Sequence, residues 1–481
     1  MNKLPPSFFW LLLGALTLFG LRHHWIQVRH PYPVEYGEGV VLNWAGRAQT
    51  GLPLYPEVTP GADPQLHNPY PPLFPMLTAG LRQILPGENP FSAGRLLSLA
   101  GTLLSALALF FLLRHRTRPL YALLGAAVFL LSPVMMRFGS MARVDPAGLA
   151  LSLFAVWLLD RAPGTKQVFT AALLASAAVM VKPTFLAAPL YVLHRVCRAR
   201  KGPDAAAMFA GAALPPLIIG ILLFTRESPN LIQHLWVLQR LPADPGAALT
   251  WLGAFLGIHA PVTAIGILQA ARPAREDADP FRVYARLTLL APLLTFLVSG
   301  SQENYLMEFW AAACISAFSL LHRPGQLPYV WLTVQLLLFL PVAPAPVFTR
   351  TYGQELPSGG RSAWTPTRAD AETGFLLSQE IRSLDEDPAP MLSADPGHLL
   401  AAGREIIYQP YQFERLAAAG KWDPDPLHES IREHRFSLIL LKGLAEDAAD
   451  PTFSPETQAH IHEHYELHRV LGPWHLYRPA W

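Results

Sequence analysis

Long apolar stretches recur through the first 343 residues, and they constrain the fold more than any other feature. A helix needs about 20 mostly apolar residues to cross the hydrocarbon core of a bilayer, where only helices and closed barrels satisfy their backbone hydrogen bonds. The sequence is 51% hydrophobic and 15% charged, which is typical of integral membrane proteins. Eleven apolar runs of spanning or near-spanning length lie at about residues 5–21, 95–113, 119–137, 145–160, 167–181, 183–197, 207–224, 248–270, 284–300, 305–321 and 328–343. We therefore expect a polytopic α-helical membrane protein with about 11 transmembrane helices.

Basic residues indicate the orientation of these helices. Clusters at 114–118, 195–201 and 272–286 fall in alternate turns between the apolar runs, and such turns face the cytoplasm under the positive-inside rule. The N-terminus is then inside, and the loop at 22–94 is outside. An odd number of spans places the C-terminal tail outside as well. Within the loop, the segment 71–85 is interrupted by prolines and a basic residue, so we interpret it as re-entrant or interfacial.

From residue 344 onward the chain changes character. This part holds 12 Lys and Arg against 20 Asp and Glu, so it is acidic where the preceding part is basic. Hydrophobic patterning predicts strands at 391–393, 405–408, 436–441, 466–470 and 474–478, and helices at 411–419, 426–433 and 455–464. We therefore divide the chain into a membrane domain at 1–343, with its first extracytoplasmic loop at 22–94, and a small soluble extracytoplasmic α/β domain at 344–481.

The polar, proline-rich stretch 31–75 lies between two apolar runs and carries two carboxylates, Glu35 and Glu38. The turn Glu-Tyr-Gly-Glu-Gly leads into residues 40–49, whose apolar side chains fall on one face of a helix that would lie along the membrane surface. Gly-Leu-Pro-Leu-Tyr follows at 51–55, and a run from His67 through Tyr70 reads His-Asn-Pro-Tyr-Pro-Pro-Leu-Phe-Pro. Prolines restrict this backbone, so we expect both carboxylates to be held near the membrane surface.

The order of these motifs resembles the first extracytoplasmic loop of the polytopic glycosyltransferases of the GT-C superfamily. It is most similar to the bacterial branch related to dolichyl-phosphate-mannose protein mannosyltransferases and the lipid A aminoarabinose transferase. The resemblance implies an inverting hexosyl- or pentosyltransferase in the bacterial inner membrane. Its partners would be a polyprenyl-phosphate-sugar donor, membrane lipid, and a glycan, lipid or protein acceptor on the outer face. No nucleic-acid motif occurs in the chain.

Such a reaction needs a carboxylate that deprotonates the acceptor hydroxyl and cations that stabilise the phosphate leaving group. Glu38 and Glu35 occupy the position where the family carries its catalytic acid. Glu38 is preferred because a glycine and the helix follow it directly, although both can also be plain solvated loop acids. For the donor phosphate the candidates are Lys182, which lies between two apolar runs and can equally snorkel to headgroups, and Arg143, which can instead pair with Asp145. Asp145 would support the catalytic acid, bind a metal ion or cap a helix.

The remaining candidates are substrate-binding or supporting residues. Tyr70 and His67 belong to the proline-rich run of the loop. Asn304 and Glu308 lie at the outer junction of two predicted spans, where an acid inside a span needs protein or water around it, although Asn304 can also cap a helix. Two further arginines, at 226 and 240, are weaker candidates for the phosphate.

No cofactor is predicted with certainty, and a divalent metal remains one alternative for this family. The histidines of the run His-Ile-His-Glu-His at 460–464 and His468 superficially suggest a metal site. We interpret them as a solvated face, because the helix is expected to end before His468. No metal ligands are therefore assigned.

Two other classes of function compete with a transferase. A transporter or flippase of lipid-linked sugars would distribute polar residues through the membrane midplane and commonly shows internal repeats, and the sequence shows none. A non-catalytic membrane protein with a partner-binding domain would explain the replacement of the family's usual Asp by Glu. A transferase instead requires Glu38, Asp145, Lys182 and Glu308 to converge on one outward cavity.

Overall fold

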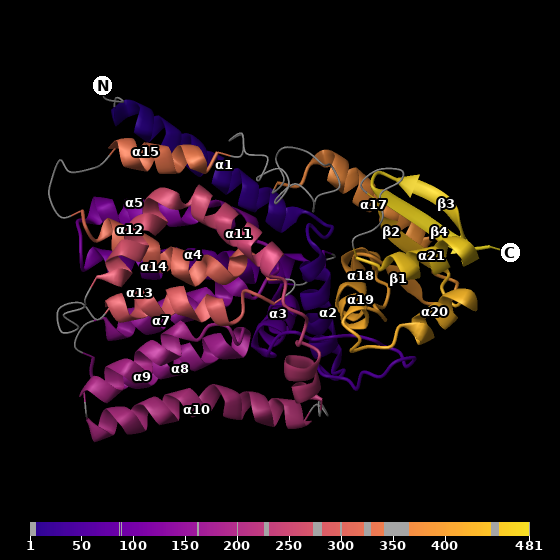
Figure 1. Ribbon diagram of the computed structural model, residues 1–481, viewed down its shortest axis with the longest axis horizontal. Coiled ribbons are helices and arrows are strands. Elements are labelled where there is room, and N and C mark those ends of the chain that lie inside the picture. Colours follow the sequence, from indigo (N-terminus) through magenta and orange to yellow (C-terminus); the bar gives the residue numbers. More distant parts are fainter. Residues whose placement is uncertain are drawn as a thin grey trace.

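A computed structural model shows a helical bundle with a small α/β domain at one end (Figure 1). The structure describes residues 6–85, 87, 89–160, 163–199, 201–225, 230–272, 281–298, 301–321, 329–340, 365–443 and 452–480. The bundle consists of α1 (Pro6–Arg29), α4 (Ser92–Arg114), α5 (Pro119–Leu130), α6 (Pro133–Phe138), α7 (Asp145–Leu159), α8 (Thr165–Val181), α9 (Ala187–Ala199), α10 (Gly202–Thr225), α11 (Pro245–Ile258), α12 (Ala260–Ala271), α13 (Phe281–Leu290), α14 (Met307–Phe318) and α15 (Tyr329–Leu338).

The protein is a membrane protein, but the count of eleven full spans is not confirmed. Within the described ranges, α4 and α10 are long and apolar enough to cross a membrane, and α11 with α12 would make a third span if that pair is counted as one. The predicted run at 248–270 is broken at His259, where α11 and α12 meet at 101°. The run at 119–137 divides into α5 and α6 because Pro133 starts a new helix.

Close helix packing holds the bundle together. A Cβ atom at Gly101 of α4 would lie 2.6 Å from the backbone of Pro146 in α7, so only glycine allows the two helices to approach this closely. Large side chains, including Trp310, Tyr191 and Tyr284, are fully buried between the helices. The ends of the helices are thereby fixed relative to one another, which is what a site built at their rim requires.

The loop after α1 folds into two helices, α2 (Tyr36–Thr50) and α3 (Leu73–Ile84), which lie between the bundle and the α/β domain (Figure 1). The prediction that α2 lies along the membrane surface stays a prediction, but protein covers both sides of this helix. Residues on both of its sides, including Val40, Leu42 and Trp44, are buried, because the α/β domain covers the face that the pattern left polar. A Cβ atom at Gly39 would lie 2.4 Å from the backbone nitrogen of Gly397 in that domain. The twelve-residue α3 packs on α2.

The C-terminal domain contains a four-stranded sheet of order β1-β2-β4-β3, formed by β1 (Met391–Ser393), β2 (Leu438–Lys442), β3 (Tyr465–Leu471) and β4 (Trp474–Pro479). The first pair is parallel and the others are antiparallel. Its helices are α17 (Arg368–Arg382), α18 (Pro396–Ala402), α19 (Pro410–Ala418), α20 (Asp425–Arg432) and α21 (Pro455–His464). Four predicted strands and three predicted helices are confirmed within one or two residues at most of their ends.

Two expectations for this domain need comment. The predicted strand at 405–408 does not join the sheet; its last residue, Tyr408, forms an isolated bridge with Gln65 of the membrane loop. The segment therefore ties the domain to the loop instead of extending the sheet. The predicted boundary between residues 343 and 344 lies outside the described residues.

Candidate active site

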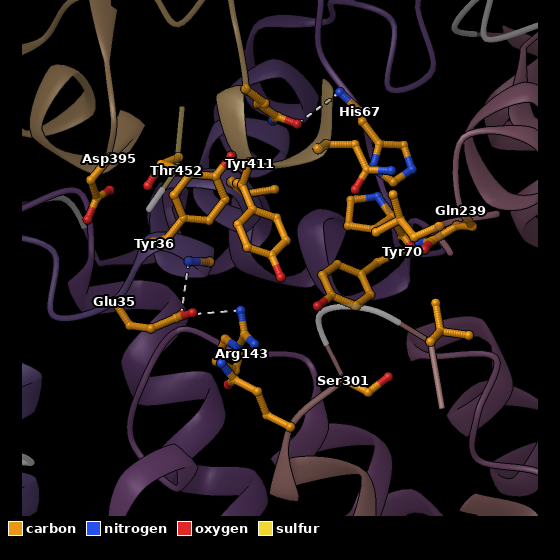
Figure 2. A pocket seen from close by; sticks show the side chains of 18 of the residues that line it. Glu35, Tyr36, His67, Tyr70, Arg143, Gln239, Ser301, Asp395, Tyr411 and Thr452 are labelled. Carbon is orange, nitrogen blue, oxygen red and sulfur yellow. Dashed lines mark hydrogen bonds and ion pairs between the residues drawn. The ribbon is translucent and has the colours of Figure 1, made fainter. Parts of the chain in front are cut away.

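A cavity of about 360 Å³ lies where the loop, the rim of the bundle and the C-terminal domain meet (Figure 2). Three parts of the chain contribute polar side chains to its walls. They include Glu35, Tyr36, His67 and Tyr70 from the loop, Arg143 and Tyr305 from the bundle, and Asp395, Tyr411 and Lys442 from the C-terminal domain. Its size and mixed polar lining are those of a small-molecule site.

Glu35 carries one of the two acids that line this cavity, the other being Asp395 of the C-terminal domain. It caps the N-terminus of α2, where its Oε2 accepts a hydrogen bond of 2.9 Å from the backbone N–H of Gly37. The same oxygen lies 3.2 Å from Nη1 of Arg143, and the two side chains are 8% and 11% exposed. A Cβ atom at Gly37 would lie 1.6 Å from that nitrogen. The glycine is therefore required for the guanidinium to reach the carboxylate.

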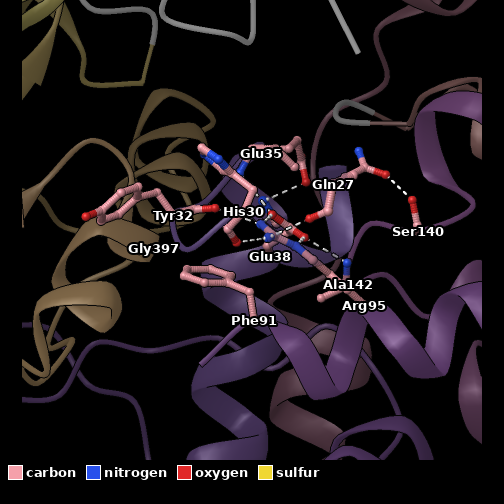
Figure 3. Close-up of polar contacts among 12 residues, drawn as sticks. Gln27, His30, Tyr32, Glu35, Glu38, Phe91, Arg95, Ser140, Ala142 and Gly397 are labelled. Carbon is pink, nitrogen blue, oxygen red and sulfur yellow. Dashed lines mark hydrogen bonds and ion pairs between the residues drawn. The ribbon is translucent and has the colours of Figure 1, made fainter. Parts of the chain in front are cut away.

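Glu38, in contrast, does not line the cavity but lies in a buried network behind it (Figure 3). Its Oε1 accepts from Nε of Arg95 at 2.8 Å and from the backbone N–H of Ala142 at 2.9 Å. Its Oε2 accepts from Nη2 of Arg95 at 2.7 Å and from the N–H of Val34 at 2.9 Å. Burial alone would raise the pKa of Glu38, but Arg95 and these N–H groups hold it below its ordinary value. Both oxygens are thus committed to structural contacts.

Arg95, which sequence reasoning missed, organises this network. Besides Glu38, it donates to the backbone oxygens of Gln27, His30 and Tyr32. Both charged side chains are fully buried. The pair thereby joins the end of α1, the start of α2 and the start of α4, and it positions the Glu35 turn without entering the cavity.

His67 and Tyr70 have different roles in the geometry. Nε2 of His67 lies 2.9 Å from the backbone oxygen of His234, and its backbone N–H donates to Oε1 of Gln409 at 2.9 Å. Burial lowers the pKa of His67 to about 3, so the ring is neutral and holds the loop to its neighbours. The hydroxyl group of Tyr70 points into the cavity, as does that of Tyr411 (Figure 2).

Lys182 and Asp145 form a second buried ion pair beside the cavity. Nζ of Lys182 lies 2.7 Å from Oδ1 of Asp145 and 3.6 Å from the ring centroid of Tyr305. Asp145 makes no capping hydrogen bond to α7, whose N-cap residue is Val144. Tyr305 lines both the main cavity and a small neighbouring pocket, so its ring connects this pair to the site.

The small pocket also brings Asn304 and Glu308 close to Asp145. Glu308 accepts a hydrogen bond of 2.9 Å from the hydroxyl of Tyr284, and both groups are buried. Asp145 thus lies near both Lys182 and Glu308, but neither these three residues nor Glu38 line the main cavity. Their convergence on one outward cavity stays a prediction. Of the two weaker phosphate candidates, the arginine at 226 lies outside the described residues, and Arg240 stacks on Trp236 at 5.0 Å.

Sequence reasoning missed the contribution of the C-terminal domain. Asp395 follows β1 and Lys442 ends β2, and these strands are parallel, so their carboxyl ends meet at one edge of the sheet, where ligands commonly bind. That signal was available from the predicted strands. The position of Tyr411 against the membrane loop was not, because it depends on how the two domains dock.

At this cavity, the described part of the chain brings together no group of three metal-ligating side chains with suitable spacing. Among the residues that the structure describes, the groups of three with suitable spacing are His428, Glu456 and His460, and His460, Glu463 and His464, all in the C-terminal domain. The helix ends at His464, as expected. His468 lies on β3, with its Nε2 3.7 Å from Glu380, so no three-histidine helical face forms.

Comparison with solved structures identifies the fold. The chain aligns with ArnT from Cupriavidus metallidurans in the apo state over 98% of both chains, with a TM-score of 0.62 and 12% identity. The same protein bound to undecaprenyl phosphate gives a TM-score of 0.60 at 12% identity over 97% of both chains. The apo oligosaccharyltransferase of Archaeoglobus fulgidus gives 0.52 at 12% identity, over 90% of this chain and 69% of that one. The chain has a GT-C-like fold. No family model and no curated protein sequence matches it.

Proposed function

We propose that this protein is a membrane glycosyltransferase that moves a sugar from a polyprenyl-phosphate donor to an acceptor on the outer face of a bacterial inner membrane. The observation that carries the proposal is the cavity in which the carboxylate of Glu35 and the guanidinium of Arg143 lie side by side. The fold supports it, since a protein with that fold has been solved with undecaprenyl phosphate bound.

Glu35 is the general base of the proposed reaction. Of the two glutamates, it alone has a carboxylate on the cavity wall, whereas both oxygens of Glu38 accept hydrogen bonds from Arg95 and the backbone. Its position at the N-terminus of α2 favours the carboxylate form through the helix dipole. Glu35 takes the proton from the acceptor hydroxyl as that oxygen attacks the sugar.

Arg143 is the cation on the cavity wall that we assign to the donor phosphate. A guanidinium binds phosphate in a bidentate manner, and in the absence of donor it holds the carboxylate of Glu35 in place at 3.2 Å. Donor binding would direct Arg143 towards phosphate and release Glu35 to act as base. Lys182 contributes positive charge at the wall formed by Tyr305, while its contact with Asp145 fixes its position.

The reaction is then a single displacement at the anomeric carbon. The acceptor oxygen forms a bond to this carbon while the bond to the phosphate oxygen breaks. The acceptor proton moves to Glu35, and the polyprenyl phosphate leaves with the bonding electrons, stabilised by Arg143. Attack opposite to the leaving group inverts the configuration of a hexose or pentose. Tyr411 and Asp395 of the C-terminal domain would contact the acceptor from the facing wall.

A transfer assay tests this function. The purified protein in lipid is incubated with a panel of radiolabelled polyprenyl-phosphate sugars, and donor consumption is compared between the wild type and Arg143→Gln. We expect consumption of one donor class by the wild type and a higher KM for that donor in the variant. If no donor in the panel is bound or consumed, the proposal fails; a flippase would bind donor and leave it chemically unchanged.

A further inference from the structure

Two helices of the C-terminal domain bring together three metal-ligating side chains away from the cavity. His428 belongs to α20, while Glu456 and His460 belong to α21, and the two helices pack against each other. One nitrogen of each histidine and one carboxylate oxygen of Glu456 all lie within 4.8 Å of one another. The two imidazole centroids are 4.5 Å apart. Sequence spacing could not show this, because one ligand comes from another helix.

Hydrogen bonds fix the tautomer of the buried histidine. Thr457 donates its hydroxyl hydrogen to the carboxylate of Glu414, with distances of 3.0 and 3.1 Å to its two oxygens. Its oxygen therefore accepts from Nε2 of His428, 3.1 Å away. The N–H is then on Nε2, and Nδ1 keeps the lone pair that binds a metal. Such a chain of carboxylate, hydroxyl and imidazole is the outer-shell arrangement that orients metal ligands.

The second histidine has an unpartnered ring nitrogen. Nδ1 of His460 is buried and has no hydrogen-bond partner among the residues that the structure describes. An imidazole binds a metal ion through the lone pair of a ring nitrogen, and the ring of His460 therefore has a nitrogen available for a ligand.

We propose that His428, Glu456 and His460 form a binding site for a divalent transition metal ion of the zinc class. Two imidazoles and one carboxylate are a ligand set that zinc uses, with a fourth position left for water. Because Zn–N bonds are about 2.0–2.1 Å long, binding would draw the three side chains closer together. The ion would thus link α20 to the first turns of α21. The alternative set of ligands comes from α21 alone, so an ion bound there would not connect two helices. That set is His460, Glu463 and His464.

Cobalt binding tests the site directly, because Co²⁺ in a tetrahedral site has visible absorption bands. The full-length protein, purified without a polyhistidine tag and stripped with a chelator, is titrated with Co²⁺ and then with Zn²⁺. We expect one Co²⁺ per chain, displacement by Zn²⁺, and a higher melting temperature with Zn²⁺. Glu456→Gln and His460→Ala should abolish the bands; Glu456 is exposed, so its replacement does not threaten folding.

Two further variants separate a built site from a chance cluster. His462→Ala is the matched control. His462 lies on the same helix, but its ring packs against Tyr477, with the ring centroids 5.3 Å apart. This variant should bind Co²⁺ as the wild type does. Thr457→Val removes the outer-shell partner and should weaken binding roughly 10–100-fold. The absence of tetrahedral bands would overturn the proposal. So would bands that survive His428→Ala and disappear in His464→Ala.

Discussion

Replacing each loop glutamate by glutamine should separate the structural acid from the catalytic one. In Glu38→Gln, Arg95 would remain buried without its counter-charge. The two hydrogen bonds from Arg95, and one of the two from backbone N–H groups, would be lost or weakened. Breaking a buried ion pair from one side costs about 3–5 kcal/mol. Glu35→Gln weakens the ion pair with Arg143 and keeps an acceptor for the N–H of Gly37. We expect a smaller loss than in Glu38→Gln, whose partner Arg95 is fully buried.

The assay is thermal unfolding of the purified proteins in the same lipid or detergent, followed by intrinsic tryptophan fluorescence. Glu38→Gln should melt several degrees below the wild type, and Glu35→Gln close to it. Arg95→Gln combined with Glu38→Gln should be less destabilised than the sum of the single variants, because the two residues are directly coupled. An unchanged melting temperature in Glu38→Gln would refute the assignment of this residue to a structural network.

Three further results are expected. Gly37→Ala should fold normally but raise the KM for donor, because its Cβ atom would occupy the place of the Arg143 guanidinium; unchanged donor kinetics would contradict this. Lys182→Met should lower the melting temperature, because it leaves the buried carboxylate of Asp145 without its lysine partner. Adding Asp145→Asn should recover part of the loss, and no recovery would show that the two residues are not coupled. The pKa of Glu38 is depressed in the folded state. The stability that the Glu38 carboxylate contributes is therefore present above the ordinary glutamate pKa and is lost as the pH falls through the pKa of the folded state. Melting curves from pH 7 to pH 3 should show this loss of stability in the wild type and not in Glu38→Gln.

The sequence could predict the elements that depend on local pattern. Apolar runs identified most of the bundle helices, and short apolar segments identified the strands of the sheet, including the continuously buried β1 and β2, because burial leaves a pattern in the residues themselves. The same pattern could not show that His259 breaks a run, or that the segment ending at Tyr408 pairs with the loop instead of the sheet. Those outcomes depend on contacts between distant segments.

The sequence could predict several residues of the candidate site, but not the role of each residue. Motif order placed Glu35, Arg143, Asp145 and Lys182 near one another, since all fall at outer helix ends or in the loop. The spacing of the sequence could not show which of Glu35 and Glu38 faces the cavity. Arg95 decides this by binding the carboxylate of Glu38, and it lies 57 residues away from Glu38 in the chain. The contribution of the C-terminal domain to the cavity could not be predicted either, because it also depends on contacts between segments far apart in the chain.

The most direct test of the account is the turnover of Glu35→Gln with saturating donor, measured beside donor affinity. A general base contributes roughly 10²–10⁴-fold to the rate, so we expect kcat to fall by that factor while donor binding and melting temperature stay close to those of the wild type. Wild-type turnover in Glu35→Gln would contradict the account, because the only glutamate on the cavity wall among the described residues would then be dispensable for transfer.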